Sequence, residues 1–313
     1  MKFSVLYTYF LISVSLILLL FTSCTQTAEK ETTQVETPLP KDPPQKLSSA
    51  FRSYWYSGKA EISSYALSQA RYGELREGQA VLVFVTEPFN AVKQVKADRA
   101  GDQSVSVLKL NSTRKFLTGL YPYSIMSSTF YPVANNQHAI KVTNSVQEWC
   151  GQVYAQLNNR EAFELQANSY FESEGDQHLK LSKSVLENEL WTQLRMDPNS
   201  LPQGDVEILP ALEYIRLKHL PFQAFKAKAI LREKDSISTY ALKYPELNRK
   251  LEIHFRTAFP HEIEGWSESY VDGYGPNAQI MTSTAKKIGQ LNSPYWSQNG
   301  NVHLALRDSL GLQ

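Results

Sequence analysis

Apolar side chains recur at every second position over much of this chain, in short segments separated by turn-forming residues. Residues 225–232 and 250–256 place apolar side chains on one face and mainly charged side chains on the other. Such alternation predicts strands with one face in solvent, as antiparallel sheets allow. Residues 80–85 are apolar on both faces, which predicts a central strand covered on both sides. The other predicted strands are residues 61–69, 105–111, 138–142, 145–156, 163–171, 236–244 and 262–271.

Helical signals are few and lie mainly between two strand-rich stretches. Residues 184–187 (Ser-Val-Leu-Glu) resemble a capping box and predict a short helix that ends before Pro198. Apolar spacing predicts a second helix over residues 205–219 and a third over residues 303–310. This order predicts a mainly β fold with a few helices: a curved antiparallel sheet or half-barrel with a helical plug, or two β-rich halves. It is similar to the element order of half-barrel envelope carriers of the LolA and LolB type.

The N-terminal segment has the features of a bacterial lipoprotein signal. An apolar run over residues 9–21 is too short for a spanning helix. It ends at residues 21–24 (Phe-Thr-Ser-Cys), which resemble a lipobox with Phe21 in place of the usual leucine. We therefore predict a signal peptide over residues 1–23 and lipidation of Cys24, which would anchor the protein stably in a membrane. The alternatives are an ordinary secretory signal with an incidental cysteine and an uncleaved anchor. Thr25, which stands in place of an aspartate, favours the outer membrane.

Composition divides the rest of the chain into a tether and a folded body. Residues 24–46 are rich in Thr, Glu and Pro and predict a disordered tether. We expect a β-rich half over residues 47–184, followed by a helix pair and a second β-rich half over residues 185–313. Net charge is +1 and both signs are interspersed, so nucleic acid is not an expected partner. Once Cys24 is acylated, Cys150 is the only thiol, and one thiol cannot form an intramolecular disulfide.

Several short segments read like the signatures of a protein family. They are residues 69–74 (Gln-Ala-Arg-Tyr-Gly-Glu), 108–111 (Leu-Lys-Leu-Asn), 118–126 (Thr-Gly-Leu-Tyr-Pro-Tyr-Ser-Ile-Met) and 145–152 (Ser-Val-Gln-Glu-Trp-Cys-Gly-Gln). Together they resemble an uncharacterised family of envelope lipoproteins that often carries the label "septum formation inhibitor Maf", and the resemblance extends over most of the chain from Tyr54. True Maf proteins are cytosolic nucleotide pyrophosphatases with a Ser-Pro-Arg-Arg motif near the N-terminus. No such run occurs here, and neither Ser53 nor Arg114 replaces it, so that activity is not expected.

Residues with catalytic potential are sparse. Cys150 is a candidate nucleophile, but it falls on a predicted strand in phase with Val146 and Tyr154, where a small buried side chain needs no chemistry. The histidines lack metal-ligand spacing, and the chain has no glycine-rich phosphate loop. We therefore expect no metal, cofactor or catalytic residue.

A polar group on the same predicted strand suggests a binding site. Glu148 shares a predicted face with Cys150, and an acid on an inner face requires a partner such as Arg71 or Lys96. Such a group would fix the head of a ligand in an apolar pocket, or it would form a structural ion pair. Nearby aromatic side chains would line the pocket or pack in the core. The candidate ligand-binding residues are Arg71, Lys96, Tyr121, Glu148, Trp149 and Tyr154.

Three functions are compatible with these patterns. The leading prediction is an envelope lipoprotein that binds or carries an apolar or amphipathic ligand. The second is a structural or interaction lipoprotein that docks an envelope protein through a sheet edge or an aromatic patch. The third is an envelope hydrolase that uses Cys150. A carrier requires a sizeable apolar cavity, an interaction protein a filled core with an exposed patch, and a hydrolase an exposed Cys150 beside a histidine.

Overall fold

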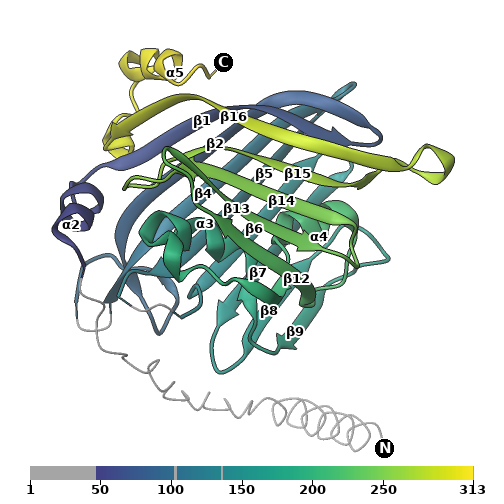
Figure 1. Cartoon of the computed structure of the whole chain (residues 1–313), viewed down its shortest axis with the longest axis horizontal. Helices are drawn as coiled ribbons and strands as arrows, with labels where there is room; N and C mark the ends of the chain where they lie inside the picture. The colour runs from purple at the N-terminus through teal and green to yellow at the C-terminus, as the bar shows by residue number, and fades with distance from the viewer. Residues whose placement is uncertain (1–46, 102–103, 135–136, 313) are drawn as a thin grey trace, which may run out of the picture. The chain divides into compact units, whose positions relative to one another are not determined.

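Successive hairpins build one large, curved and unclosed sheet of sixteen strands, so the protein is mainly β, as predicted (Figure 1). The computed structural model describes residues 47–101, 104–134 and 137–312. The predicted signal peptide, the predicted lipidation site Cys24 and the predicted tether over residues 24–46 lie outside these residues.

The strands alternate with short turns, and helices occur at four places in the described chain. The strands are β1 (Ala60–Arg71), β2 (Glu74–Asn90), β3 (Val95–Lys96), β4 (Ser104–Thr118), β5 (Tyr121–Pro132), β6 (Lys141–Glu148), β7 (Gly151–Asn159), β8 (Phe163–Asn168), β9 (Gln177–Leu181), β10 (Val185–Leu186), β11 (Gly204–Leu209), β12 (Phe225–Arg232), β13 (Ile237–Tyr244), β14 (Arg249–Arg256), β15 (Ile263–Asp272) and β16 (Gln279–Ser293). The helices are α2 (Ser49–Trp55), α3 (Glu187–Met196), α4 (Leu212–Lys218) and α5 (Ala305–Ser309).

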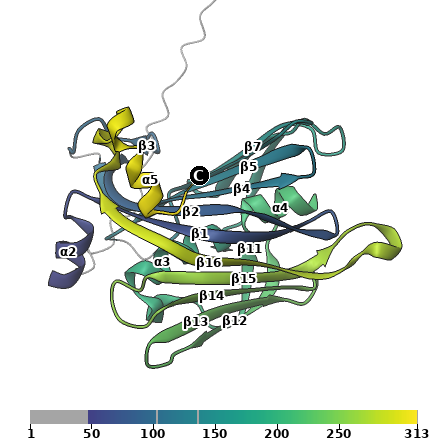
Figure 2. The ribbon, with the colours of Figure 1, turned by 90° about the horizontal axis from the view of Figure 1, so that it is seen from above.

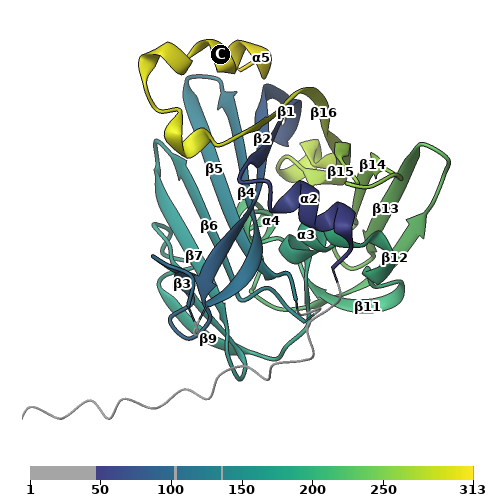
Figure 3. The same cartoon turned by 90° about the vertical axis from the view of Figure 1, so that its left-hand side faces the viewer.

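The chain enters the sheet near its centre, runs to one edge, and then returns to the centre from the opposite edge. From β1 it passes through β2 and β4 to β9 at one edge, continues with β10 at the opposite edge, and returns through β11 to β16, which pairs with β1. All pairings are antiparallel except that of β10 with β11. Leu181 ends β9 and Val185 begins β10, and a step of four residues spans at most about 14 Å. The two edges therefore approach each other there, and the sheet must curl (Figure 3).

Two helices occupy the concave face of this sheet (Figure 2, Figure 3). Trp191 and Leu194 of α3 are buried in the main apolar cluster, where the Trp191 ring meets the Trp266 ring of β15 edge-on at 5.3 Å. Leu212 and Ile215 of α4 pack with apolar side chains of β7 and β8. The cavity left between α4 and strands β6 to β8 has a volume of about 30 Å³, enough for one or two water molecules. This part of the concave face is filled with protein.

Charged side chains also fix the helices to the sheet. Arg249 of β14 donates to both carboxylate oxygens of Glu187 at 2.5 and 2.6 Å, and to Glu268 of β15 at 2.7 Å. All three side chains are almost completely buried. Nearer the other end of α3, Arg195 donates to both oxygens of Glu61 at 2.5 and 2.6 Å. A buried charge requires a partner, so these pairs define where α3 lies.

The convex face is covered in part by the C-terminal segment. Leu310 packs against Ala60, Ile62 and Val85. A Cβ atom on Gly289 would lie 2.8 Å from the carbonyl oxygen of Ser309, which is closer than real Cβ contacts. Glycine at this position therefore lets the C-terminal segment approach the sheet.

Most predicted elements are present, but two assignments are wrong. Residues 145–156 form a hairpin rather than one strand, because β6 ends at Glu148 and β7 starts at Gly151. Residues 205–219 are helical only in their second half. Residues 204–209 pair with β12 as strand β11, because Val206 and Ile208 also alternate with polar residues. Pro210 then separates this strand from α4.

Other differences concern boundaries and one missed helix. The predicted strand over residues 138–142 begins only at Lys141, and α3 begins at Glu187 after the short strand β10. Glu189 completes the start of α3, because its carboxylate accepts from the backbone N–H of Leu186 at 3.1 Å. Helix α2 was not expected from the sequence, and it is capped by the Ser48 side chain. The two expected β-rich halves belong to one sheet, because β1 pairs with β16, and at residues 184/185 the chain passes from one edge of this sheet to the other.

Substituting Arg249→Met would leave two buried carboxylates without their partner. We expect the free energy of unfolding to fall by about 3–5 kcal/mol. The control is Arg232→Met, because Arg232 pairs with Glu252 at 3.2 Å on an exposed strand face and is worth less than about 1 kcal/mol. Urea unfolding followed by circular dichroism measures both values. A loss for Arg249→Met no larger than that of the control would contradict this role.

Candidate functional site

Several turns of the sheet meet at one end of the molecule. The strand registers place the β1–β2, β4–β5, β6–β7 and β15–β16 turns together, with the β8–β9 connection beside them. In Figure 1 and Figure 2 the β15–β16 turn projects at the right, opposite α2. We call this the aromatic end and define it by six residues. They are Tyr72, Tyr121, Tyr123, Trp149, Tyr170 and Tyr274.

The rings of the aromatic end contact one another in a continuous series. Tyr274 stacks with Tyr72 at 6.1 Å between centroids, and Tyr72 meets Tyr123 at 6.4 Å. Tyr121 lies 6.0 Å from Tyr123 and 6.5 Å from Trp149. Aromatic pairs at such separations stabilise each other beyond their simple burial. Four separate turns thus share one ordered row of rings.

Tyr170 extends this row onto the β8–β9 connection. Its ring covers Gly151 so closely that a Cβ atom there would lie 2.5 Å from the ring. The next ring along the chain, Phe171, meets Tyr170 at 5.4 Å and lies under the Arg216 guanidinium at 4.4 Å. The C-terminal part of α4 is therefore packed against the aromatic end.

Arg71 lies beneath the rings and is buried, with 5% of its surface exposed. Its guanidinium donates to the Leu217 carbonyl oxygen of α4 at 2.7 Å and to the hydroxyls of Tyr72 and Tyr123 at 3.2 and 3.1 Å. Among the described residues, no carboxylate pairs with it, and its Nε atom has no hydrogen-bond partner. A cation at the C-terminal end of a helix is favoured by the helix dipole. Arg71 therefore links the tyrosines to α4.

A second buried arginine lies close to this group. Arg216 of α4 is 3.5 Å from Glu174, whose carboxylate also contacts His219 at 2.6 Å. Burial lowers the pKa of the Arg216 side chain, with the nearby charge of Arg71 acting in the same direction against the opposing effect of Glu174. The two arginines of this end, Arg71 and Arg216, are therefore buried, and only Arg216 has a carboxylate partner among the described residues.

Four of the six candidate ligand-binding residues lie at the aromatic end: Arg71, Tyr121, Glu148 and Trp149. The other two candidates do not join them. Lys96 lies on β3, paired to the far end of β2, and is 3.8 Å from Glu87. Tyr154 lies on the face of β7 opposite the buried residues, with its hydroxyl bonded to Gln156 at 2.9 Å. Among the described residues, Glu148 forms no ion pair with Arg71 or Lys96, so both predicted partners of this carboxylate are wrong.

Cys150 also differs from expectation, because the β6–β7 turn places it in solvent. The predicted inner face shared by Val146, Glu148, Cys150 and Tyr154 does not exist, since the chain reverses between β6 and β7. Glu148 accepts the backbone N–H of Cys150 at 2.7 Å. Hydrogen bonding to Glu148, with its negative charge, raises the pKa of the Cys150 thiol. This carboxylate neighbour opposes the thiolate that a nucleophile requires.

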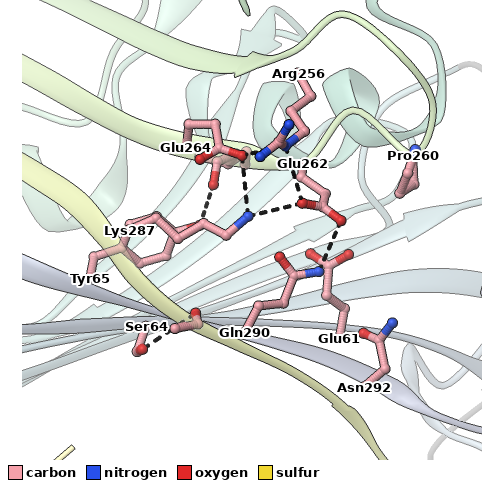
Figure 4. Close-up of polar contacts among 12 residues, drawn as sticks. Glu61, Ser64, Tyr65, Arg256, Pro260, Glu262, Glu264, Lys287, Gln290 and Asn292 are labelled. Carbon is pink, nitrogen blue, oxygen red and sulfur yellow. Dashed lines mark hydrogen bonds and ion pairs between the residues drawn. The ribbon is translucent and has the colours of Figure 1, made fainter. Parts of the chain in front are cut away.

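The opposite end of the sheet carries a polar group that sequence reasoning missed (Figure 4). Lys287 donates to Glu262 at 2.9 Å and to Glu264 at 3.3 Å, and Arg256 bonds Glu264 at 2.7 Å. Burial acts to raise the pKa of Glu262, but hydrogen bonds from Lys287 and Gln290 outweigh it, so this pKa lies below its usual range. These charges satisfy one another and leave no isolated reactive group.

A cleft of about 210 Å³ opens beside this polar group, next to α2. It is lined by Tyr54, Glu61 and Asn292, among others. Glu61 is already bound by Arg195 and by the Tyr54 hydroxyl, so its carboxylate is not free for a ligand. The sequence could have shown that Glu61 is buried, because Glu61 is in phase with the buried Tyr65 and Leu67 of the same strand.

The described part of the chain contains no group of three or more His, Cys, Asp or Glu side chains placed to hold a metal ion. None of its helices has the length and apolar character needed to cross a membrane.

No protein-family model matches the chain, and no curated protein or solved structure matches it. The resemblance to envelope lipoproteins therefore stays a prediction.

The exposed position of Cys150 makes its chemistry measurable. We expect alkylation of the native thiol, but slowly at neutral pH, because a raised pKa leaves little thiolate. Glu148→Gln is expected to lower this pKa and accelerate the reaction at the same pH, whereas Glu172→Gln, an exposed acid of the next loop, is the control. The measurement is the iodoacetamide rate against pH by mass spectrometry. A thiol that reacts only after unfolding would refute the exposed turn.

Proposed function

We propose that this chain is an interaction protein of the cell envelope, tethered at its N-terminus, that docks through its aromatic end. The observation that carries the proposal is the combination of a filled concave face with apolar side chains exposed together at the turns. This was the second of the functions predicted from the sequence. It needs no enclosed ligand pocket.

Because α3 and α4 fill part of the concave face, docking of a partner is favoured over transport of a ligand. Helices α3 and α4 occupy the place where a carrier would hold an apolar ligand. Opening that face would separate Glu187 from Arg249, and breaking a buried ion pair costs on the order of several kcal/mol. The carrier function stays a prediction, and it receives no comparable support from the packing.

The exposed apolar side chains are unevenly distributed. Of the seventeen large ones in the described chain, eight lie at or next to the turns of the aromatic end. They are Leu75, Leu117, Leu120, Trp149, Tyr170, Val271, Tyr274 and Ile280. The surface of a monomer rarely gathers apolar side chains in this way without a binding role. Leu120 is 81% exposed, Tyr274 70% and Trp149 68%, so these three are best placed to contact a partner.

The tether predicted from the sequence is compatible with this arrangement. The described chain begins at Leu47, just before α2, and α2 leads into β1. The twelve residues of β1 carry the chain about 40 Å to the aromatic end. The 23 residues from Cys24 to Leu47 reach about 70 Å if fully extended. That length allows the aromatic end to reach the anchoring surface or a neighbouring one.

Site-specific photocrosslinking in intact cells tests the proposal. A photoreactive amino acid is placed at Leu120 or Tyr274 of the full chain, and the control position is Val302, which is 85% exposed at the other end. We expect covalent adducts with an envelope component from the first two positions and not from the third. If neither turn gives adducts above the Val302 background, the protein does not dock through the aromatic end.

A further inference from the structure

We infer that the surface contacted by the aromatic end is the interface of a phospholipid bilayer, into which its turns insert. The inference rests on the proposed function and names the partner. Three independent features of the aromatic end support a bilayer: the kinds of side chain, their placement on turns, and the local balance of charge.

The side chains are of the kind that favours a membrane interface. Trp149 and Tyr274 each have an apolar ring with one polar atom, and such rings concentrate at the level of lipid headgroups. Leu120 and Ile280 are purely aliphatic and exposed, 81% and 67% respectively, which suits the upper acyl region. Amphipathic rings and aliphatic side chains exposed at the same end suit the boundary between headgroup and hydrocarbon.

The placement on turns favours insertion rather than contact with a flat protein surface. Leu120 lies in the β4–β5 turn, Trp149 in the β6–β7 turn and Tyr274 in the β15–β16 connection. Each is therefore carried on a separate projection. The contacts between rings, such as Tyr121 with Trp149, order the turns before binding. Ordered projections lose little conformational freedom when they enter a soft layer.

Two part-exposed cations of this end are paired with carboxylates. Arg76 lies 2.5 Å from Glu74, and Lys218 lies 3.3 Å from Asp272. Because Arg76 and Lys218 are paired and Arg71 is buried, these three cations form no exposed basic patch for anionic headgroups. Insertion should therefore depend on apolar contact, proceed on zwitterionic lipid, and change little with salt.

Cys150 provides a reporter within the aromatic end, because it is exposed and adjoins Trp149. The full lipidated chain is labelled at this thiol with an environment-sensitive fluorophore and reconstituted in phosphatidylcholine vesicles. We expect a blue-shifted emission that is quenched by spin-labelled lipids, at both low and high sodium chloride. Membrane attachment through the lipid anchor does not by itself change this emission, because the fluorophore is on the folded body.

The matched control moves the probe to the other end, as Val302→Cys in a Cys150→Ser background. This probe is expected to remain in water, with no quenching. A second control adds phosphatidylglycerol, which should change the Cys150 signal little. A Cys150 probe that stays in water, or a signal that is lost in high salt, overturns the bilayer inference. Equal quenching at position 302 overturns it as well.

The double variant Leu120→Ser, Tyr274→Ser tests the named side chains. We expect the ratio of inserted to free probe to fall on the order of tenfold or more, because two exposed apolar contacts are removed. The melting temperature should fall only slightly, since neither side chain is part of the buried core and the only ring contact removed within the described chain is the stack of Tyr274 on Tyr72. Unchanged insertion would contradict the inference. Photocrosslinks from Leu120 to protein alone, with no insertion into vesicles, would leave the proposed function standing and remove the bilayer as its partner.

Discussion

The buried contact of Arg249 with Glu187 and Glu268 is the constraint on which the arrangement of sheet and helices depends. It joins α3 to two neighbouring strands that follow it by about 60 to 80 residues, through bonds of 2.5 to 2.7 Å. Neither carboxylate tolerates burial without the guanidinium, so α3 has few alternative positions. Apolar contacts such as that of Trp191 with Trp266 are less selective, because many apolar surfaces fit one another.

The same contact holds the helices against the concave face, so a binding surface has to lie on the outside of the molecule. A curved sheet with an empty concave face would offer a pocket, but here α3 and α4 are held inside by charge and packing. The two ends of the sheet then differ in character. One end has a self-satisfied polar group around Lys287, and the other has exposed rings. The second end gathers eight of the seventeen large exposed apolar side chains of the described chain, and this concentration makes it the part suited to binding.

Sequence patterns predicted the strands well because each strand carries its own alternation. The error at residues 145–156 arose because the prediction joined Val146 and Tyr154 in one face, whereas the buried positions change phase at the turn, from Val142 and Val146 of β6 to Val153 and Ala155 of β7. The error at residues 205–209 arose because Ile208 fits both a strand and a helix spacing. The partner of Glu187 could not be found at all, since pairing with Arg249 depends on which strands become neighbours. For the same reason Arg71, Tyr121 and Trp149 were found as candidates, whereas Tyr72 and Tyr274 were not.

Tyr72 shows that the aromatic end is more than a chance gathering of rings. Its backbone has a φ of 59° in the β1–β2 turn, next to Gly73 at 78°, a region that favours glycine and costs other residues roughly 1 kcal/mol or more. The structure offsets this cost through the Tyr72 side chain. Its hydroxyl lies 2.6 Å from that of Tyr123, and its ring stacks on Tyr274. A glycine or asparagine would relieve the strain but remove the ring that connects the β15–β16 turn to the rest of the row. The strained backbone thus holds an aromatic side chain at the junction of two turns, where the order of the whole aromatic end depends on it.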